Sequence, residues 1–259
     1  VIAWMHTLAE CLKWDSALQE TLSQVRLVFM PIVNPVGMYR TWRSNGNGVD
    51  LMRNSPVVGE DEPLFLVGGQ TISNQLPWFR GFVEKFEDME KESQALCRVV
   101  RDELLPSRFS IALDVHSGFG SIDRLWFPYA KTTRPCPHLV EVTALKDVFD
   151  RSYPNHVYKV EPQSDSYTTH GDLWDYMYDQ HLADPQSIKG SQEKTFLPWT
   201  LEMGSWLWLK KNPRQLFSSL GPFNPLLPHR QKRILRRHVI LLDFLLRAVQ
   251  SHGKWIPRD

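Results

Sequence analysis

Cysteine is scarce in this sequence, and its few cysteines are not paired by spacing. Cys11, Cys97 and Cys136 are the three cysteines in a chain of 259 residues, and no Cys-x-x-Cys motif occurs. A disulfide-rich secreted scaffold and a cysteine-based zinc module are therefore excluded. An odd and widely spaced set of thiols is typical of a reducing compartment, so we predict a cytoplasmic location.

Long apolar runs and an excess of one charge are also missing. No stretch approaches the ~20 apolar residues that a membrane-spanning helix needs, and no charged and then apolar leader opens the chain. Thirty basic residues stand against twenty-nine acidic ones, which gives a net charge of +1. We therefore expect neither a membrane nor nucleic acid as a partner, and the oligomeric state is left open.

The chain is long and apolar enough for one large core. With 42% hydrophobic residues, we expect residues 1–259 to form one α/β domain. Helices alternating with strands predict a mixed, mostly parallel sheet with helices on both faces. The patterns predict helices at 2–14, 16–23, 91–105, 139–152, 171–181, 205–211 and 229–250, and strands at 26–34, 110–116, 156–160 and 196–203.

The last predicted helix is strongly basic in its first half. These residues could face a phosphate backbone, but no aromatic residues are interleaved with them and the whole chain is close to neutral. We interpret this half as a solvated face beside an apolar stripe at residues 241–246. The basic residues are Arg230, Lys232, Arg233, Arg236 and Arg237.

One histidine stands at the end of an apolar strand. Ile111, Leu113 and Val115 predict a buried strand that delivers Asp114 and His116 into a glycine-containing loop. Open α/β sheets place their chemistry at such strand ends. By itself, the stretch is more typical of a core strand followed by a turn, with a hydrogen-bonded structural histidine, because one histidine is a weak signal for metal binding or catalysis.

Other chemistry-bearing residues also stand at a strand end and in loops. Glu202 ends an apolar strand, where burial would raise its pKa unless an arginine pairs with it, so it is a candidate general base. Tyr167 lies in a polar segment before a predicted helix. Guanidinium groups in a long polar loop can bind a carboxylate or an oxyanion, or can simply be solvated. The loop contains Arg40, Arg43 and Arg53.

In their order along the chain, these motifs resemble those of the zinc carboxypeptidase family. Members carry an Asn-Pro-x-Gly turn, an arginine, a Gly-Val-Asp-x-Asn-Arg-Asn segment, a His-Ser pair that ends a strand, a tyrosine, and a glutamate that ends a late strand. The resemblance extends from the first helix to Gly204. The corresponding residues here are Asn34–Gly37, Arg43, Gly48–Asn54, His116 and Ser117, Tyr167, and Glu202.

The resemblance implies a zinc-dependent metallocarboxypeptidase that hydrolyses the C-terminal peptide bond of its substrate. It implies Zn²⁺ as cofactor, with His116 as one ligand, and Glu202 as the general base that activates water. It also implies that Arg43 stabilises the oxyanion of the tetrahedral intermediate. Arg53 would clamp the free carboxylate of the substrate, and Tyr167 would close over it. Asp114, by contrast, would order the loop or support the histidine.

Two departures from the family pattern keep alternatives open. Met52 stands where the family has an asparagine beside its carboxylate-binding arginine, and this removes a hydrogen-bond donor. A zinc-dependent deacylase of small N-acyl amino acids is therefore an alternative. A serine hydrolase that uses Ser117 is disfavoured, because the Gly-x-Ser-x-Gly elbow is missing.

The second departure concerns the other two zinc ligands. In the family they come from a His-x-x-Glu motif before the first helix, and no such motif precedes Asn34 here. His6 and Glu10 share a helix face, but their spacing is wrong. We therefore expect a chain truncated before the N-terminal strand and metal loop. If Val1 is the true start, the expectation is a non-catalytic relative that binds peptide tails.

Overall fold

The computed structural model describes residues 1–118, 120–184, 194–217 and 223–257, and within these ranges four strands form one sheet. β1 and β4 are parallel, β2 and β3 are parallel, and β2 runs antiparallel to β4. The sheet is thus mixed and mostly parallel, which confirms the predicted fold class. The strand order is β1 (Phe109–His116), β4 (Thr195–Glu202), β2 (Arg124–Phe127) and β3 (Lys159–Pro162).

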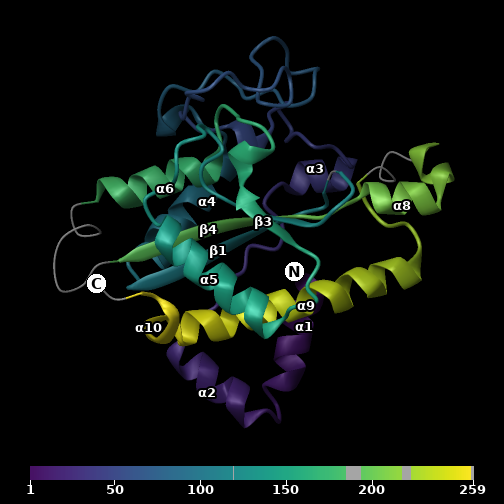
Figure 1. Ribbon diagram of the computed structural model, residues 1–259. Coiled ribbons are helices and arrows are strands. Elements are labelled where there is room, and N and C mark those ends of the chain that lie inside the picture. Colours follow the sequence, from purple (N-terminus) through teal and green to yellow (C-terminus); the bar gives the residue numbers. More distant parts are fainter. Residues whose placement is uncertain (119, 185–193, 218–222, 258–259) are drawn as a thin grey trace.

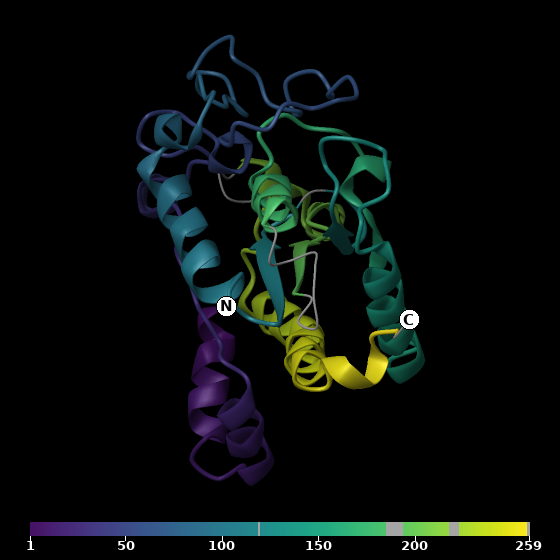
Figure 2. The same ribbon diagram turned by 90° about the vertical axis from the view of Figure 1, so that its left-hand side faces the viewer.

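Helices cover both faces of this sheet (Figures 1 and 2). On one face lie α4 (Lys91–Val99) and α6 (Leu173–Ala183), of which α6 packs against β4. On the other face lie α5 (Leu139–Ser152) and α9 (Pro228–Gln250), of which α9 packs against β1. No helix in the described ranges is long and apolar enough to cross a membrane.

Shorter elements surround this three-layer body. α1 (Ile2–Cys11) and α2 (Ser16–Gln24) form a hairpin at the lower end of Figure 1, broken where predicted at Asp15, which caps α2. The others are α3 (Pro35–Arg40), η1 (Leu51–Arg53), η2 (Phe86–Asp88), η3 (Val100–Leu104), η4 (Gln163–Asp165), α8 (Trp206–Lys211), η5 (Pro213–Phe217) and α10 (His252–Trp255).

The core centres on β4. All eight residues of this strand are buried, because it lies between β1 and β2 and has helices on both sides. Phe196, Leu197 and Leu201 of β4 belong there to one apolar cluster that also contains Met177 and Tyr178 of α6. A strand buried on both faces needs a continuous apolar run, and this is why the sequence identified β4 correctly.

The predicted strand at residues 26–34 is wrong. Residues 26–33 make no backbone hydrogen bond to any described residue, and the edge of β1 away from β4 has no strand beside it. Met30 and Val33 do pack on the core, while Val28 and Ile32 are exposed. An apolar run satisfies the packing requirement of a strand, but only a neighbouring strand can supply the hydrogen-bonded ladder.

Candidate functional site

His116 and Glu202 lie next to each other because β1 and β4 end together. The two strands are parallel and in a register that pairs His116 with Glu202 at their carboxyl ends. His116 Nδ1 and Glu202 Oε2 are 3.1 Å apart. The Glu202 side chain is only 9% exposed, so this contact holds an acid at the rim of the core. Two residues far apart in the sequence thus form one polar centre.

A glycine allows the two strand ends to approach this closely. Gly118 has φ +100°, and a Cβ atom there would lie 1.5 Å from the carbonyl oxygen of Met203. The buried Ser205 hydroxyl donates to the Gly118 carbonyl, which ties the two chain segments together. Any side chain at position 118 would push the segment after His116 away from the segment after Glu202.

Asp114 holds the other side of the histidine ring. Its Oδ2 lies 2.9 Å from His116 Nε2 and accepts a hydrogen bond from Trp174 Nε1 at 3.0 Å. Burial lowers the pKa of His116, but the charge and hydrogen bond of Asp114, and then those of Glu202, outweigh it and raise this pKa well above its ordinary value. Both ring nitrogens therefore face carboxylates.

One acid orients Arg43, and other nitrogens of its guanidinium group remain available as hydrogen-bond donors. Its Nε donates to Asp50 Oδ2 at 2.7 Å, with Asp50 buried and the Arg43 side chain 44% exposed. Burial lowers the pKa of Arg43, but Asp50, with smaller effects from Tyr167 and Glu202, raises it overall. The two Nη groups have no carboxylate partner among the described residues. They are the donors that an incoming anion can use.

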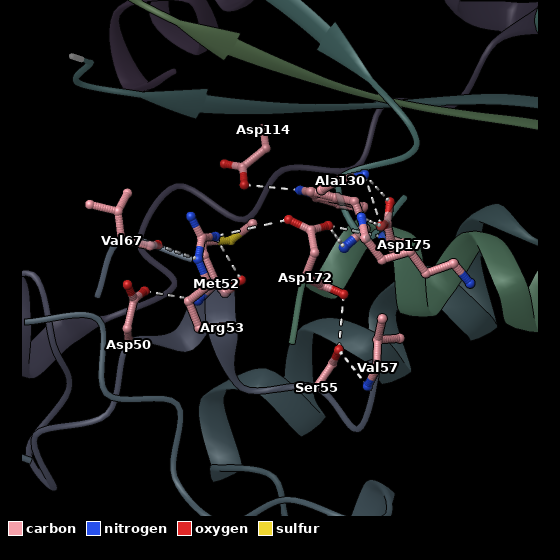
Figure 3. Close-up of polar contacts among 12 residues, drawn as sticks. Asp50, Met52, Arg53, Ser55, Val57, Val67, Asp114, Ala130, Asp172 and Asp175 are labelled. Carbon is pink, nitrogen blue, oxygen red and sulfur yellow. Dashed lines mark hydrogen bonds and ion pairs between the residues drawn. The ribbon is translucent and has the colours of Figure 1, made fainter. Parts of the chain in front are cut away.

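Arg53 is buried and has several partners (Figure 3). Its Nε donates to the Val67 carbonyl and its Nη1 to the Met52 carbonyl, both at 3.2 Å. Nη1 also lies 4.0 Å from Asp172 Oδ2. The remaining nitrogen, Nη2, points away from these partners, toward the side on which Asp114 lies. Nη2 is therefore the guanidinium nitrogen for which no partner is found among the described residues.

Asp172 links Arg53 to α6. Its Oδ1 accepts from the backbone N–H groups of Trp174 and Asp175 and so caps the helix, while Oδ2 faces Arg53. Burial raises the pKa of Asp172, although Arg53 acts in the opposite direction. Gly171 makes the approach possible, because a Cβ atom there would lie 1.8 Å from the Arg53 carbonyl oxygen.

A second buried acid on α6 orders the chain after β2. Asp175 is 1% exposed and accepts hydrogen bonds from the backbone N–H groups of Ala130 and Lys131, which Figure 3 shows converging on it. Burial, followed by the charge of Asp172, raises the pKa of Asp175 well above its ordinary value. These contacts attach the segment after β2 to the first turn of α6.

Tyr167 lies half-buried between η4 and α6. Its ring meets Trp126 of β2 edge to face, with centroids 5.9 Å apart. Trp126 also lines a small cavity, together with Asp172, Trp174 and Thr200. Tyr167 thus contacts one of the residues that line this cavity, and it also lies near enough to Arg43 for its charge to influence the pKa of that arginine.

A zinc ion finds one suitable ligand in the described residues. A metal-bound imidazole usually has a carboxylate at its other ring nitrogen, and Asp114 at Nε2 fits this arrangement, but the second nitrogen of His116, Nδ1, contacts Glu202. However, no group of three His, Cys, Asp or Glu side chains in the described ranges could hold a metal ion. The set of metal ligands is thus incomplete within these ranges.

The structure brings together His116, Glu202, Arg43 and Tyr167, all predicted from the sequence, and puts Arg53 on the other side of Asp172. Sequence reasoning did not select Asp50, Asp172 or Trp174. The helix-capping position of Asp172, directly after a glycine, was a readable signal for Asp172 alone. The contacts of Asp50 with Arg43 and of Trp174 with Asp114 depend on loops and helices meeting in space.

Comparisons with known proteins bear on the family and on the fold of this chain. The family model described as zinc carboxypeptidase matches residues 1–203. No curated protein matches the sequence. Among solved structures, the crystal structure of thrombin activatable fibrinolysis inhibitor (TAFI) is similar, with a TM-score of 0.61 and 16% sequence identity over 97% of this chain. The match covers 57% of that chain, so this chain spans less than two thirds of its length.

Proposed function

The chain belongs to the zinc carboxypeptidase family. We propose that it hydrolyses the last peptide bond of its substrate and so releases the C-terminal amino acid, which bears the free carboxylate. The observation that carries this proposal is the pair of His116 and Glu202, 3.1 Å apart at two strand ends, with Arg43 close by. These are the residue types that amide hydrolysis needs, namely an acid for proton transfer and a cation for the developing oxyanion.

Glu202 has the central role in the proposal. As a carboxylate it takes a proton from the attacking water, and it then passes that proton to the nitrogen of the leaving amine, so that it ends the cycle unchanged. Its 9% exposure limits competition from bulk water, and its contact with His116 fixes the orientation of its carboxylate.

Arg43 and Arg53 divide the anionic charges of the reaction between them. The two Nη groups of Arg43 stabilise the oxyanion that forms at the scissile carbonyl, while Asp50 fixes the arginine from behind. Arg53 binds the substrate carboxylate through Nη2, and Tyr167 covers the bound substrate. Since Met52 contributes no side-chain hydrogen-bond donor, Arg53 binds the substrate carboxylate without help from the neighbouring side chain.

Zinc is the cofactor that the family implies, and among the described residues His116 is the one that would help to hold it. Bound zinc would supply a Lewis acid that polarises the scissile carbonyl and lowers the pKa of water. Small N-acyl amino acids are the second substrate class to test, because Met52 leaves Arg53 without a neighbouring side-chain donor for the C-terminus of a peptide.

The experiment is the Glu202→Gln substitution, assayed by amino-acid release from N-acylated dipeptides and from N-acetyl amino acids with zinc present. We expect a fall in kcat of about 10²- to 10⁴-fold, because glutamine keeps the shape but cannot take a proton. Glu103→Gln, which changes a surface acid paired with Arg26, is the matched control and should keep full activity. An E202Q protein as active as this control would refute the general-base role.

A non-catalytic relative that binds carboxylate-bearing tails is the second candidate. It is favoured by the incomplete donor set and by the two carboxylates that occupy both nitrogens of His116. In that case, zinc-supplemented protein would hydrolyse neither substrate class. It would still bind a peptide with a free C-terminus more tightly than its amide, and Arg43→Ala would weaken this binding.

A further inference from the structure

The net charge of +1 conceals a strong separation of charge along the chain. Residues 203–242 contain eight lysines and arginines and no aspartate or glutamate. The other 219 residues therefore carry twenty-two basic and twenty-nine acidic side chains, a net charge of −7. A forty-residue segment with charge of one sign produces a local field that the whole-chain value does not reveal.

Most of these cations are exposed and have no acidic partner. Among the described residues, the Lys and Arg side chains of the segment form a single ion pair, between Arg237 and Asp123 at 2.8 Å. Arg230 and Arg237 are half-buried. The exposed ones are Lys210, Lys211, Arg214, Lys232, Arg233 and Arg236.

The cations gather at one end of the molecule, which we call the basic end and define as α8, η5 and residues 228–240 of α9. In Figure 1 these elements lie together at the right-hand end, away from α10. On α9, Lys232, Arg233 and Arg236 recur at helical spacing on the exposed face, while His238 and Leu241 face the core. The helix thus presents a continuous cationic stripe.

Large apolar side chains are exposed among the cations. Phe217, the last residue of η5, is 94% exposed, and Ile240 continues the exposed face of α9 at 48%. Isolated exposed apolar residues are ordinary on protein surfaces, but a group of them within a cationic surface is not. The group consists of Trp206, Leu216, Phe217, Phe223, Leu226, Leu235 and Ile240.

We propose that the basic end binds the surface of an anionic lipid bilayer. The lysines and arginines contact the lipid headgroups, and the apolar side chains enter the boundary between headgroups and acyl chains. Basic residues with aromatic and aliphatic neighbours are the combination that peripheral membrane binding uses. The acidic remainder of the chain is repelled by the same surface, so binding fixes one orientation.

Nucleic acid fits this surface less well. A phosphate backbone would engage the cations equally, and the rings of Trp206, Phe217 and Phe223 could stack on bases. The aliphatic side chains of Leu216, Leu235 and Ile240, however, have no aromatic face on which a base could stack. In a bilayer these aliphatic side chains leave water, which favours binding. The exposed apolar residues therefore distinguish the two polyanions.

The test is co-sedimentation of the chain with vesicles of phosphatidylcholine, with and without phosphatidylserine. We expect binding only when phosphatidylserine is present, and release at high salt because exposed charges are screened. The triple variant K232Q/R233Q/R236Q should reduce the partition coefficient more than about tenfold, since each cation near an anionic surface contributes on the order of 1 kcal/mol. F217S should also weaken vesicle binding.

The matched control is K91Q/R108Q/K254Q, which removes three exposed cations from other elements and so makes the same change in net charge. This control should bind vesicles almost as the wild type does, and circular dichroism should report the same fold for all variants. The proposal is overturned if the wild type ignores phosphatidylserine vesicles, or if the two triple variants bind equally. It is also overturned if F217S binds vesicles unchanged while a DNA duplex binds as tightly as they do.

Discussion

At the residue scale, Arg53 is the side chain whose surroundings explain most about specificity. It is almost fully buried, yet its nearest acid oxygen, on Asp172, is 4.0 Å away and two of its donors face carbonyl oxygens. A buried guanidinium whose charge is only partly neutralised by its neighbours is stabilised by a further anion. A substrate carboxylate at Nη2 would provide it.

Arg53→Lys tests this reading, because lysine keeps the charge but loses the planar fork. We expect the ratio of kcat/KM for a free-acid substrate over its amide to fall about tenfold or more. The control is Arg80→Lys, since Arg80 is also buried and also donates to carbonyls, those of Ser55 and Val57. Equal losses of selectivity in both variants would show that Arg53 has no special role.

Asp175 predicts a pH dependence of stability. Its pKa is raised on folding, so the folded state holds the proton more tightly, and this contribution is fully present below the unfolded pKa of about 3.9. It is lost as the pH rises through the folded-state pKa. Relative to the wild type, Asp175→Asn should therefore gain in melting temperature from pH 4 upward.

Thermal unfolding followed by circular dichroism at a series of pH values measures this difference. Asp165→Asn changes an exposed acid on the neighbouring loop and serves as the control, with a constant offset from the wild type. A constant offset for Asp175→Asn as well would contradict the assigned burial of its charge.

At the element scale, the site depends on how closely the ends of β1 and β4 approach. Gly118→Ala would put a Cβ atom 1.5 Å from the Met203 carbonyl oxygen, at a positive φ that disfavours side chains. We expect this variant to lose more than about 2 kcal/mol of unfolding free energy. Urea denaturation measures it.

Gly46→Ala is the control for that variant, because a Cβ atom there meets nothing closer than 3.6 Å. It should change stability by less than about 1 kcal/mol. If the two alanine variants unfolded at the same urea concentration, the close approach of the two strand ends would not limit stability.

The elements also show where sequence patterns succeed. Residues 139–152 form a helix with the predicted bounds, because an amphipathic stripe alone specifies a helix that packs on a sheet. β2 was not predicted, since its four residues are too short for a period to stand out. Residues 91–105 were predicted as one helix, but they change from α4 to a π-helical turn at η3.

At the scale of the whole molecule, the family assignment predicts that the protein binds zinc. If His116 is a zinc ligand, His116→Ala should lower the zinc content of the purified protein by about tenfold or more. His170→Ala, which removes a half-buried imidazole bonded to the Gly59 N–H, is the control and should not change it. Elemental analysis after gel filtration measures both, and equal zinc in wild type and H116A would exclude this ligand.

Charge and location also belong to this scale. The sequence total of +1 led us to expect no membrane partner, whereas the fold gathers the acid-free segment at one end. The net charge is a sum over the whole chain and does not show where the charges lie. Only the arrangement of α8, η5 and α9 brings these cations together on one surface. The cytoplasmic location stays a prediction from cysteine usage.

The sequence by itself determined the family and the fold class, and it supplied the candidate site residues. Alternating helix and strand patterns, a histidine and a glutamate at strand ends, and arginines in one loop can all be recognised locally, because they follow from side-chain type and spacing. The family match over residues 1–203 agrees with that reading.

Only the tertiary structure decided which of these residues meet. Strand register pairs His116 with Glu202, the approach of Gly171 to Arg53 brings Asp172 to the guanidinium, and Trp174 reaches Asp114 from α6. Such contacts join segments distant in sequence, and their existence depends on packing between elements rather than on any local pattern. For the same reason, an apolar run at residues 26–34 could not become a strand without a partner beside it.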